Sequence, residues 1–130
     1  MATEARIRTP LARVRGLGAS KSGTEDFWRV RLTSVALVPL TIAFVVIVIS
    51  LMGRNHAAVV QILGSPLIAI LMLLFVVTSA YHMWLGMQEI IVDYVHDEIW
   101  KFAALMANTF FCVVCGFACV YALLKLSLGL

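Results

Sequence analysis

The stretch Leu67-Ile-Ala-Ile-Leu-Met-Leu-Leu-Phe-Val-Val-Thr-Ser-Ala-Tyr-His82-Met-Trp-Leu-Gly86 decides the fold, because it contains no Asp, Glu, Lys or Arg. It belongs to a longer uncharged run, Ile62–Gln88, and two similar runs are Leu32–Met52 and Phe102–Leu124. A helix rises about 1.5 Å per residue, so about 20 apolar residues cross the roughly 30 Å hydrocarbon layer of a bilayer. Each run therefore predicts one transmembrane helix.

The overall composition agrees with a membrane protein. Hydrophobic residues make up 62% of the 130 residues and charged residues only 13%, whereas soluble domains carry about 25% charged residues. Because lipid offers no partners for backbone polar groups, the spans must be helical. We expect an all-α integral membrane protein with a basic arm and the entry to the first helix at residues 1–31 and a three-helix transmembrane anchor domain at residues 32–125.

Positive charge is concentrated before the first span. Cations are favoured on the cytoplasmic side of a membrane protein, which places the N-terminus in the cytoplasm. A nucleic-acid tail is the other reading of such an arm, but a topology determinant is typical of a three-span chain. We expect a bacterial cytoplasmic membrane in preference to the mitochondrial inner membrane, a flexible or partner-ordered arm over residues 1–24, and no removable secretory signal. The arm's cations are Arg6, Arg8, Arg13, Arg15, Lys21, Arg29 and Arg31.

The connection between the second and third spans is acidic, although it faces the same side as the arm. Acidic residues contribute little to membrane orientation, so the predicted topology is unaffected. Contact with another protein and a site at the membrane edge are the two roles expected for these carboxylates. They are Glu89, Asp93, Asp97 and Glu98, against Lys101.

Except for Ser79 and Gln88, the polar groups of the second span share one face of the helix. With His82 at 0° and about 100° per residue, Glu89 lies near −20°, Asp93 near 20°, Gly86 near 40° and Thr78 near −40°. Most other positions are large and apolar. This stripe predicts that the face meets something other than lipid.

His82 is the central residue of the stripe, since an ionisable group inside a membrane is costly unless it is paired or lines a cavity. Three roles are open to it: a structural hydrogen bond to a neighbouring helix, a proton relay, or ligation of a metal such as haem iron. Gly86, one turn away, leaves room for a flat macrocycle. A second axial ligand would come from a methionine of this chain or from another subunit.

Asp93 and Tyr94 lie where the second span ends, about 16–18 Å along the helix axis from His82. A phenol can donate a hydrogen bond to a quinone oxygen, and a nearby carboxylate can hold the phenol or relay protons. The ordinary alternatives are an aromatic residue of the headgroup layer and a surface charge at a helix end.

The cysteines of the third span resemble a redox or metal motif, Cys112-Val-Val-Cys115 with Cys119. They lie inside an apolar helix with no neighbouring charge to stabilise a thiolate. Together with Asn108 they follow helical spacing and form a face of small residues, which is how membrane helices pack closely. We therefore expect packing here and no disulfide.

Two motifs together resemble the small membrane-anchor subunits (cytochrome b small subunits) of succinate dehydrogenase, respiratory complex II. One is His82-x-x-x-Gly86 followed by Asp93-Tyr94. The other is Gly23-Thr-Glu-Asp26-Phe27-Trp-Arg-Val-Arg31-Leu-Thr33, similar to the family's G-x-x-D-F-x-x-V-R-x-T segment before the first span. The resemblance covers residues 16–125.

The resemblance implies a function that the residues alone do not establish. It implies that His82 is one axial ligand of haem b, shared with a second, cytochrome b556-type anchor subunit, and that Arg31 lies near the haem propionates. It also implies that Tyr94 binds ubiquinone with Asp93 close by. Its other partners would be an iron–sulfur subunit and a flavoprotein subunit that oxidises succinate, so no succinate site is expected here. Glu25 stands where some relatives have histidine, and no role is assigned to it.

Two other functions are consistent with the sequence. One is a structural membrane anchor or assembly protein without a cofactor, in which His82 makes only a packing hydrogen bond. The other is a proton channel, which needs a polar path across the whole bilayer. The polar stripe ends at Thr78 and gives way to the apolar run Leu67–Val77, which disfavours the channel.

Overall fold

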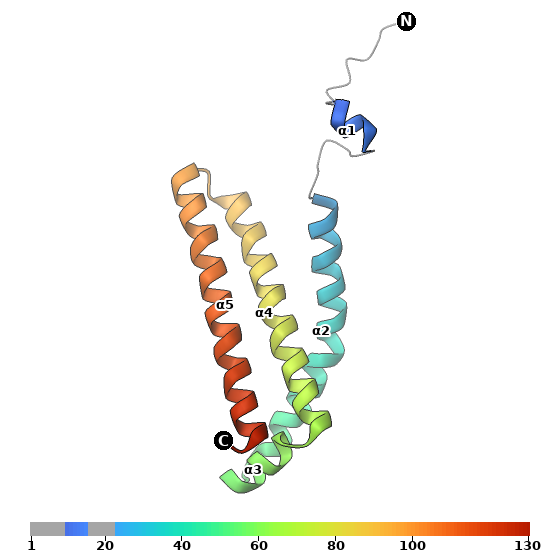
Figure 1. The fold of residues 1–130 in the computed structure, drawn as a ribbon, viewed down its shortest axis with the longest axis vertical. Helices are drawn as coiled ribbons and strands as arrows, with labels where there is room; N and C mark the ends of the chain where they lie inside the picture. The colour runs from blue at the N-terminus through green and yellow to red at the C-terminus, as the bar shows by residue number, and fades with distance from the viewer. Residues whose placement is uncertain (1–9, 16–22) are drawn as a thin grey trace, which may run out of the picture.

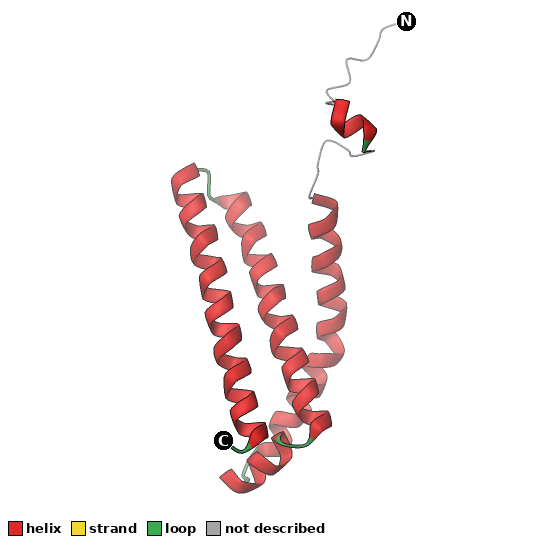
Figure 2. Cartoon of the chain, in the orientation of Figure 1, coloured by secondary structure: helices red, strands yellow, loops and turns green. Residues whose placement is uncertain are grey.

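The computed structural model describes residues 10–15 and 23–130, and in these ranges it contains helices and no strand (Figures 1 and 2). Three helices are long and apolar enough to cross a membrane. The predicted all-α integral membrane fold with three spans is therefore confirmed. The helices are α1 (Pro10–Val14), α2 (Gly23–Leu51), α3 (His56–Leu63), α4 (Pro66–Tyr94) and α5 (Glu98–Leu128).

Helix α4 is the centre of the anchor, because it packs against both α2 and α5. The three long helices lie in the order α2, α4, α5 across the molecule, and α3 lies at the end where the chain terminates (Figure 1). At the opposite end α2 and α5 begin and α4 ends. With 29 residues, α4 is about 44 Å long, so its ends extend beyond the roughly 30 Å hydrocarbon layer.

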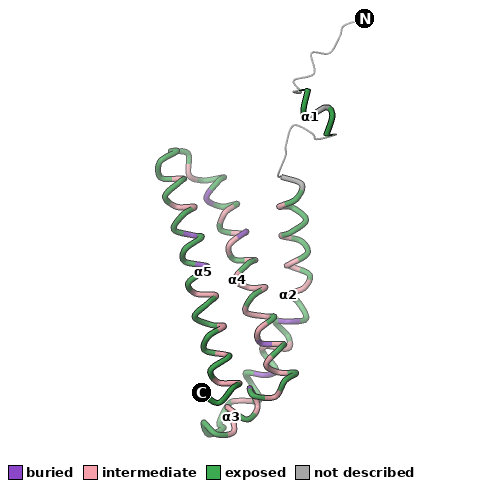
Figure 3. Tube along the Cα trace, in the orientation of Figure 1, coloured by how far each residue is buried: buried purple, intermediate pink, exposed green. Residues whose placement is uncertain are grey.

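The anchor has little core of its own. Among the described residues, most large hydrophobic side chains are exposed (Figure 3). A soluble protein rarely exposes so much apolar surface, so lipid tails and partner helices are the surroundings that this surface requires. The residues classed as buried are Leu40, Ile47, Leu63, Met72, Leu85, Ile91, Cys112 and Asn108.

Asn108 joins α5 to α4 through a buried polar contact. Its Nδ2 donates to the backbone oxygen of Trp84 at 3.1 Å, and its Oδ1 accepts from the Sγ of Cys112 at 3.4 Å. The prediction that this face of α5 packs is confirmed at Asn108 and Cys112, both buried. Cys119, further along the same helix, is exposed.

Gly64 ends α3 at a place where a side chain would be crowded mainly by the last turn of α3 itself. An ideal Cβ at Gly64 would lie 2.9 Å from the backbone oxygen of Val60 and 3.4 Å from that of Ser127. Helix α4 then starts at Pro66, with Ser65 at its N-cap. Proline in the first turn lacks a donor that would be unpaired there anyway, which favours a helix start at this position.

The start of α5 gives two of the acidic residues a local role. The carboxylate of Asp97 accepts from two backbone N–H groups of the first turn, at 3.0 and 3.1 Å. Glu98 also lies in this turn, where negative charge is favoured by the helix dipole. Glu89 and Asp93 are exposed and have no such role, so they are the carboxylates left for a partner or a site.

Two helices and one boundary were not predicted. Helix α3 lies in the segment expected to connect the first two spans, and the Oδ1 of Asn55 caps it by accepting from the N–H of Ala58 at 2.9 Å. Helix α1 lies within the basic arm. Helix α2 begins at Gly23, so the predicted arm–anchor boundary at Leu32 falls inside it. Residues 1–9 and 16–22 of the arm lie outside the described residues.

Candidate functional site

His82 lies on the side of α4 that meets α2. The Nδ1 of His82 and the Oγ1 of Thr33 are 2.8 Å apart, although the two residues belong to different spans. His82 is half-buried. The prediction that the polar stripe meets something other than lipid is therefore confirmed at its central residue.

Thr33 connects this imidazole to the backbone of α2. Its Oγ1 lies 2.8 Å from the carbonyl oxygen of Arg29 and 3.0 Å from that of Val30. A threonine that bonds the preceding turn of its own helix has a restricted side-chain rotation. The hydroxyl is thus held at a defined place opposite His82.

The other ring nitrogen of His82, Nε2, has no hydrogen-bond partner among the described residues. One turn further along α4, an ideal Cβ at Gly86 would have no heavy atom within 4 Å. An imidazole nitrogen without a partner in the described part of the chain and an unobstructed glycine one turn away fit a flat, metal-containing group such as haem, since neutral imidazole is a common iron ligand.

This chain does not build a complete metal site from its own side chains. Over residues 10–15 and 23–130, no group of three or more His, Cys, Asp or Glu side chains is close enough to hold a metal ion. His56 begins α3 and His96 follows α4, so these histidines lie towards opposite ends of the anchor. A metal bound at His82 would therefore need ligands other than the His, Cys, Asp and Glu side chains of the described residues.

Arg31 is not brought together with His82. Its guanidinium carbon lies 4.2 Å from the ring centroid of Phe27, and the side chain is exposed. Arg31 and Thr33 are separated by about 200° around α2, so Arg31 lies on a different face from the contact with His82. The exposed guanidinium of Arg31 is accessible to a group bound from outside the chain. The place of Arg31 near haem propionates stays a prediction.

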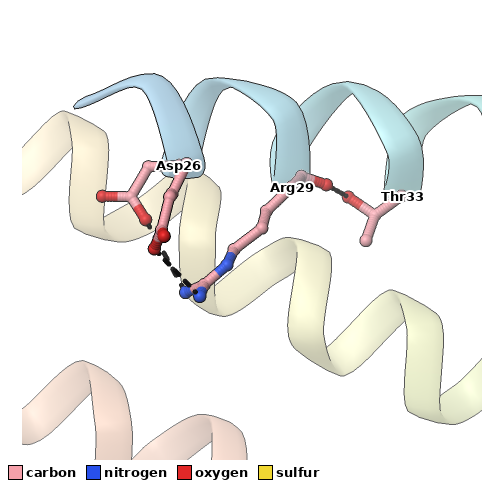
Figure 4. A network of polar contacts seen from close by, with 4 residues as sticks. Asp26, Arg29 and Thr33 are labelled. Carbon is pink, nitrogen blue, oxygen red and sulfur yellow. Dashed lines mark hydrogen bonds and ion pairs between the residues drawn. The ribbon is translucent and has the colours of Figure 1, made fainter. Parts of the chain in front are cut away.

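Arg29 is the cation on the same side of α2 as Thr33. Its guanidinium lies 3.4 Å from a carboxylate oxygen of Glu25 and 3.9 Å from one of Asp26. Figure 4 shows this network together with the contact between Thr33 and the Arg29 carbonyl. The pairs are largely exposed, so each stabilises the helix by less than about 1 kcal/mol.

Asp93 and Tyr94 form the last turn of α4. Tyr94 is 77% exposed, and Asp93 is exposed as well. Their position at the helix end agrees with a place at the membrane edge. Within the described part of the chain they do not form a closed pocket, so a ligand bound there would also contact another subunit or lipid.

Sequence reasoning missed Thr33 as a site residue. The signal was present, since Thr33 is a polar residue near the start of an apolar span and closes the segment compared with G-x-x-D-F-x-x-V-R-x-T. Its contact with His82 depends on how α2 and α4 pack, which helical periodicity within either segment does not specify.

The fold and the site together define a class: a three-span integral membrane protein whose central helix presents an imidazole between helices and an exposed phenol at its end. Comparison with known proteins identifies one family within this class. The family described as succinate dehydrogenase/fumarate reductase transmembrane subunit matches residues 5–121. The chain therefore belongs to this family, as its motifs indicated.

Two relatives that share one name with each other also match the chain. A succinate dehydrogenase hydrophobic membrane anchor subunit from Paracoccus denitrificans is 32% identical over 124 residues, which cover 95% of each chain. A protein of the same name from Rickettsia bellii (strain RML369-C) is 28% identical over 89 residues, 68% of this chain and 71% of the relative. No solved structure matches the chain.

Proposed function

We propose that this chain is the hydrophobic anchor of a succinate:ubiquinone oxidoreductase and that His82 provides one axial ligand of haem b. The observation that carries the proposal is the hydrogen bonding of the two ring nitrogens of His82. Its Nδ1 is occupied by Thr33 at 2.8 Å, whereas Nε2 has no partner among the described residues. The open space at Gly86, one helical turn from His82, supports the proposal because a bulky side chain there would compete with a macrocycle.

The proposed haem is shared between two chains. A second membrane-anchor subunit of the cytochrome b556 type supplies the other axial ligand, because the described residues offer no second histidine near His82. Arg31 is the residue proposed to neutralise propionate charge at the membrane edge. When bound, haem b supplies a carrier for single electrons.

Tyr94 and Asp93 are proposed to form part of a ubiquinone-reduction site. The Tyr94 phenol donates a hydrogen bond to a quinone carbonyl oxygen, and Asp93 holds the phenol or relays protons to it. Ubiquinone takes up two electrons and two protons to become ubiquinol. The electrons come from succinate by way of the flavoprotein and iron–sulfur subunits, and this chain takes no part in succinate oxidation.

The proposed setting is the cytoplasmic membrane of a bacterium, with the N-terminus in the cytoplasm. Helix α4 ends and α2 and α5 begin on that side, so Tyr94 and Asp93 lie there too. The exposed carboxylates Glu89 and Asp93 are then available for contact with the iron–sulfur subunit. This arrangement places the quinone site next to the electron donor.

A second candidate function is a structural anchor without a cofactor. The observation in its favour is the His82–Thr33 contact itself, since a hydrogen bond between membrane helices stabilises their association by about 0.6 kcal/mol on average. In this reading His82 is a packing residue, and its replacement would weaken the anchor without changing any absorption signal.

The two functions are separated by reduced-minus-oxidised absorption spectra of the whole purified complex. We expect His82→Ala to abolish the low-spin b-type signal, either by loss of haem or by conversion to a high-spin spectrum. His96→Ala, which changes an exposed histidine outside the helices, is the matched control and should leave the spectrum intact. An unchanged spectrum in assembled His82→Ala complex would exclude ligation by His82.

Gly86→Leu provides a second variant that leaves His82 in place. The new side chain meets nothing within this chain at its Cβ, so it should not disturb the packing of α4 itself. We expect reduced haem content per complex, because the leucine occupies the space proposed for the macrocycle. Full haem content in this variant would place the macrocycle elsewhere.

A further inference from the structure

The hydroxyl of Thr33 has one proton and three polar neighbours. Two of them, the carbonyl oxygens of Arg29 and Val30 at 2.8 and 3.0 Å, can only accept. The third is the Nδ1 of His82 at 2.8 Å, which donates or accepts according to the tautomer. The position of the single proton therefore determines the tautomer of the imidazole.

The carbonyl contacts decide where this proton lies. If Thr33 donated to His82, its oxygen would face two carbonyl oxygens at hydrogen-bond distance with no proton between them, which is repulsive. If Thr33 donates to the carbonyls of its own helix, its lone pair is available to the imidazole. Nδ1 then carries the proton and donates to Thr33, and Nε2 carries the free lone pair.

We propose that Thr33 is a positioning residue that fixes His82 in the Nδ1–H tautomer and orients Nε2 for ligation. This inference rests on the proposed function, because the free lone pair matters only if His82 binds a metal. Histidine ligands commonly donate their second N–H to an acceptor that sets the ring orientation and increases ligand basicity. Here the acceptor comes from a different span, so the ligand is positioned by the packing of α2 against α4.

The test compares three variants of the complete complex. Thr33→Val has the same shape as threonine and removes the acceptor. Thr33→Ser keeps a hydroxyl that can bond the same carbonyls. Ser34→Ala is the matched control, since Ser34 also bonds its own helix, at 2.7 Å from the Val30 oxygen, but its hydroxyl makes no hydrogen bond to α4 among the described residues.

The readouts are the midpoint potential of the haem, its electron paramagnetic resonance signal, and the rate of haem loss from the complex. In Thr33→Val we expect a higher potential, because a less basic imidazole stabilises oxidised iron less. We also expect a shifted resonance and haem loss faster by about 10-fold or more, the usual effect of removing such an outer partner. Thr33→Ser and Ser34→Ala should resemble the wild type.

The same variants distinguish a wrong role for Thr33 from a wrong role for His82. If His82→Ala abolishes the low-spin signal and Thr33→Val leaves potential, resonance and haem loss unchanged, His82 is a ligand and Thr33 does not position it. If Thr33→Ser is affected as strongly as Thr33→Val, packing rather than the hydroxyl is responsible, and the inference is overturned. If His82→Ala leaves the haem signal intact, both proposals fail.

Discussion

At position 82 an imidazole lies within a membrane span, with Nδ1 bonded to Thr33 and with no partner for Nε2 among the described residues. A polar group that is transferred from water to an apolar environment without a hydrogen bond costs about 1–3 kcal/mol, as judged from mutations in proteins. Thr33 removes part of this cost at Nδ1. A metal bound at Nε2, as proposed, would offset the cost that remains there.

At Tyr94 the relevant group is an exposed phenol. Tyr94→Phe removes one hydrogen-bond donor and keeps the ring, so we expect quinone reduction to slow by about 3- to 10-fold, the equivalent of roughly 0.5–1.5 kcal/mol. The measurement is succinate:ubiquinone activity of the purified complex beside succinate oxidation with a soluble artificial acceptor, which should persist.

Tyr121→Phe serves as the control for this prediction, because Tyr121 is also exposed but lies towards the end of α5, far from the α4–α5 connection next to Tyr94. It should leave both activities unchanged. Equal loss of both activities in Tyr94→Phe would indicate damage to assembly rather than a missing donor at the quinone.

The candidate residues on α4 were predictable because each is an exception to an apolar pattern. His82, Gly86 and Asp93 stand out from a run of large hydrophobic residues, and their helical angles group them. Thr33 was not predicted as a site residue, because a single threonine near the start of a span does not stand out from the sequence. Only the packing of α2 on α4 shows that it meets the imidazole.

At the scale of helices, α4 is held by different means on its two sides. Against α5 it uses the Asn108–Trp84 bond and small side chains, whereas against α2 it uses His82–Thr33 and the stacked rings of Phe44 and Phe75, whose centroids are 4.4 Å apart. The spans themselves followed from hydropathy. Hydropathy did not predict α3 as a separate helix, because its apolar residues run into the next span and only Gly64-Ser65-Pro66 separates the two.

Gly64 provides a prediction about how α3 ends. In Gly64→Ala the new methyl group would lie 2.9 Å from the Val60 oxygen, so backbone must shift, and overpacking of this kind costs about 1–3 kcal/mol. We expect a lower thermal stability of the detergent-purified complex. Gly116→Ala, whose Cβ would lie 3.4 Å from the Ala80 methyl group, should change the melting temperature much less. Equal melting of both variants would contradict the close approach.

At the scale of the whole molecule, the anchor is an open row of helices with few buried residues. Length, composition and charge were sufficient to predict three spans, because hydropathy reports directly on the membrane environment. They could not reveal which exposed apolar surfaces face lipid and which face another subunit, since both surroundings favour the same side chains. Membership of a family of transmembrane subunits agrees with this exposed surface, because a subunit has partner chains that can cover part of it.

The distribution of cations predicts the orientation of this row. Alkaline phosphatase fused after Leu130 should be active, because its disulfides form only outside the cytoplasm. The same enzyme inserted after His96, in the α4–α5 connection, should be inactive. The reverse pattern of activities would place Tyr94 on the outer side and would contradict a quinone site next to a cytoplasmic electron donor.

The most direct test of the central claim is an experimental structure of the whole complex at a resolution that locates the haem. We expect an iron atom bonded to the Nε2 of His82, with Nδ1 still within hydrogen-bond distance of the Thr33 hydroxyl and the macrocycle edge beside Gly86. A complex in which His82 contacts only side chains or lipid, with no porphyrin at its Nε2, would contradict it.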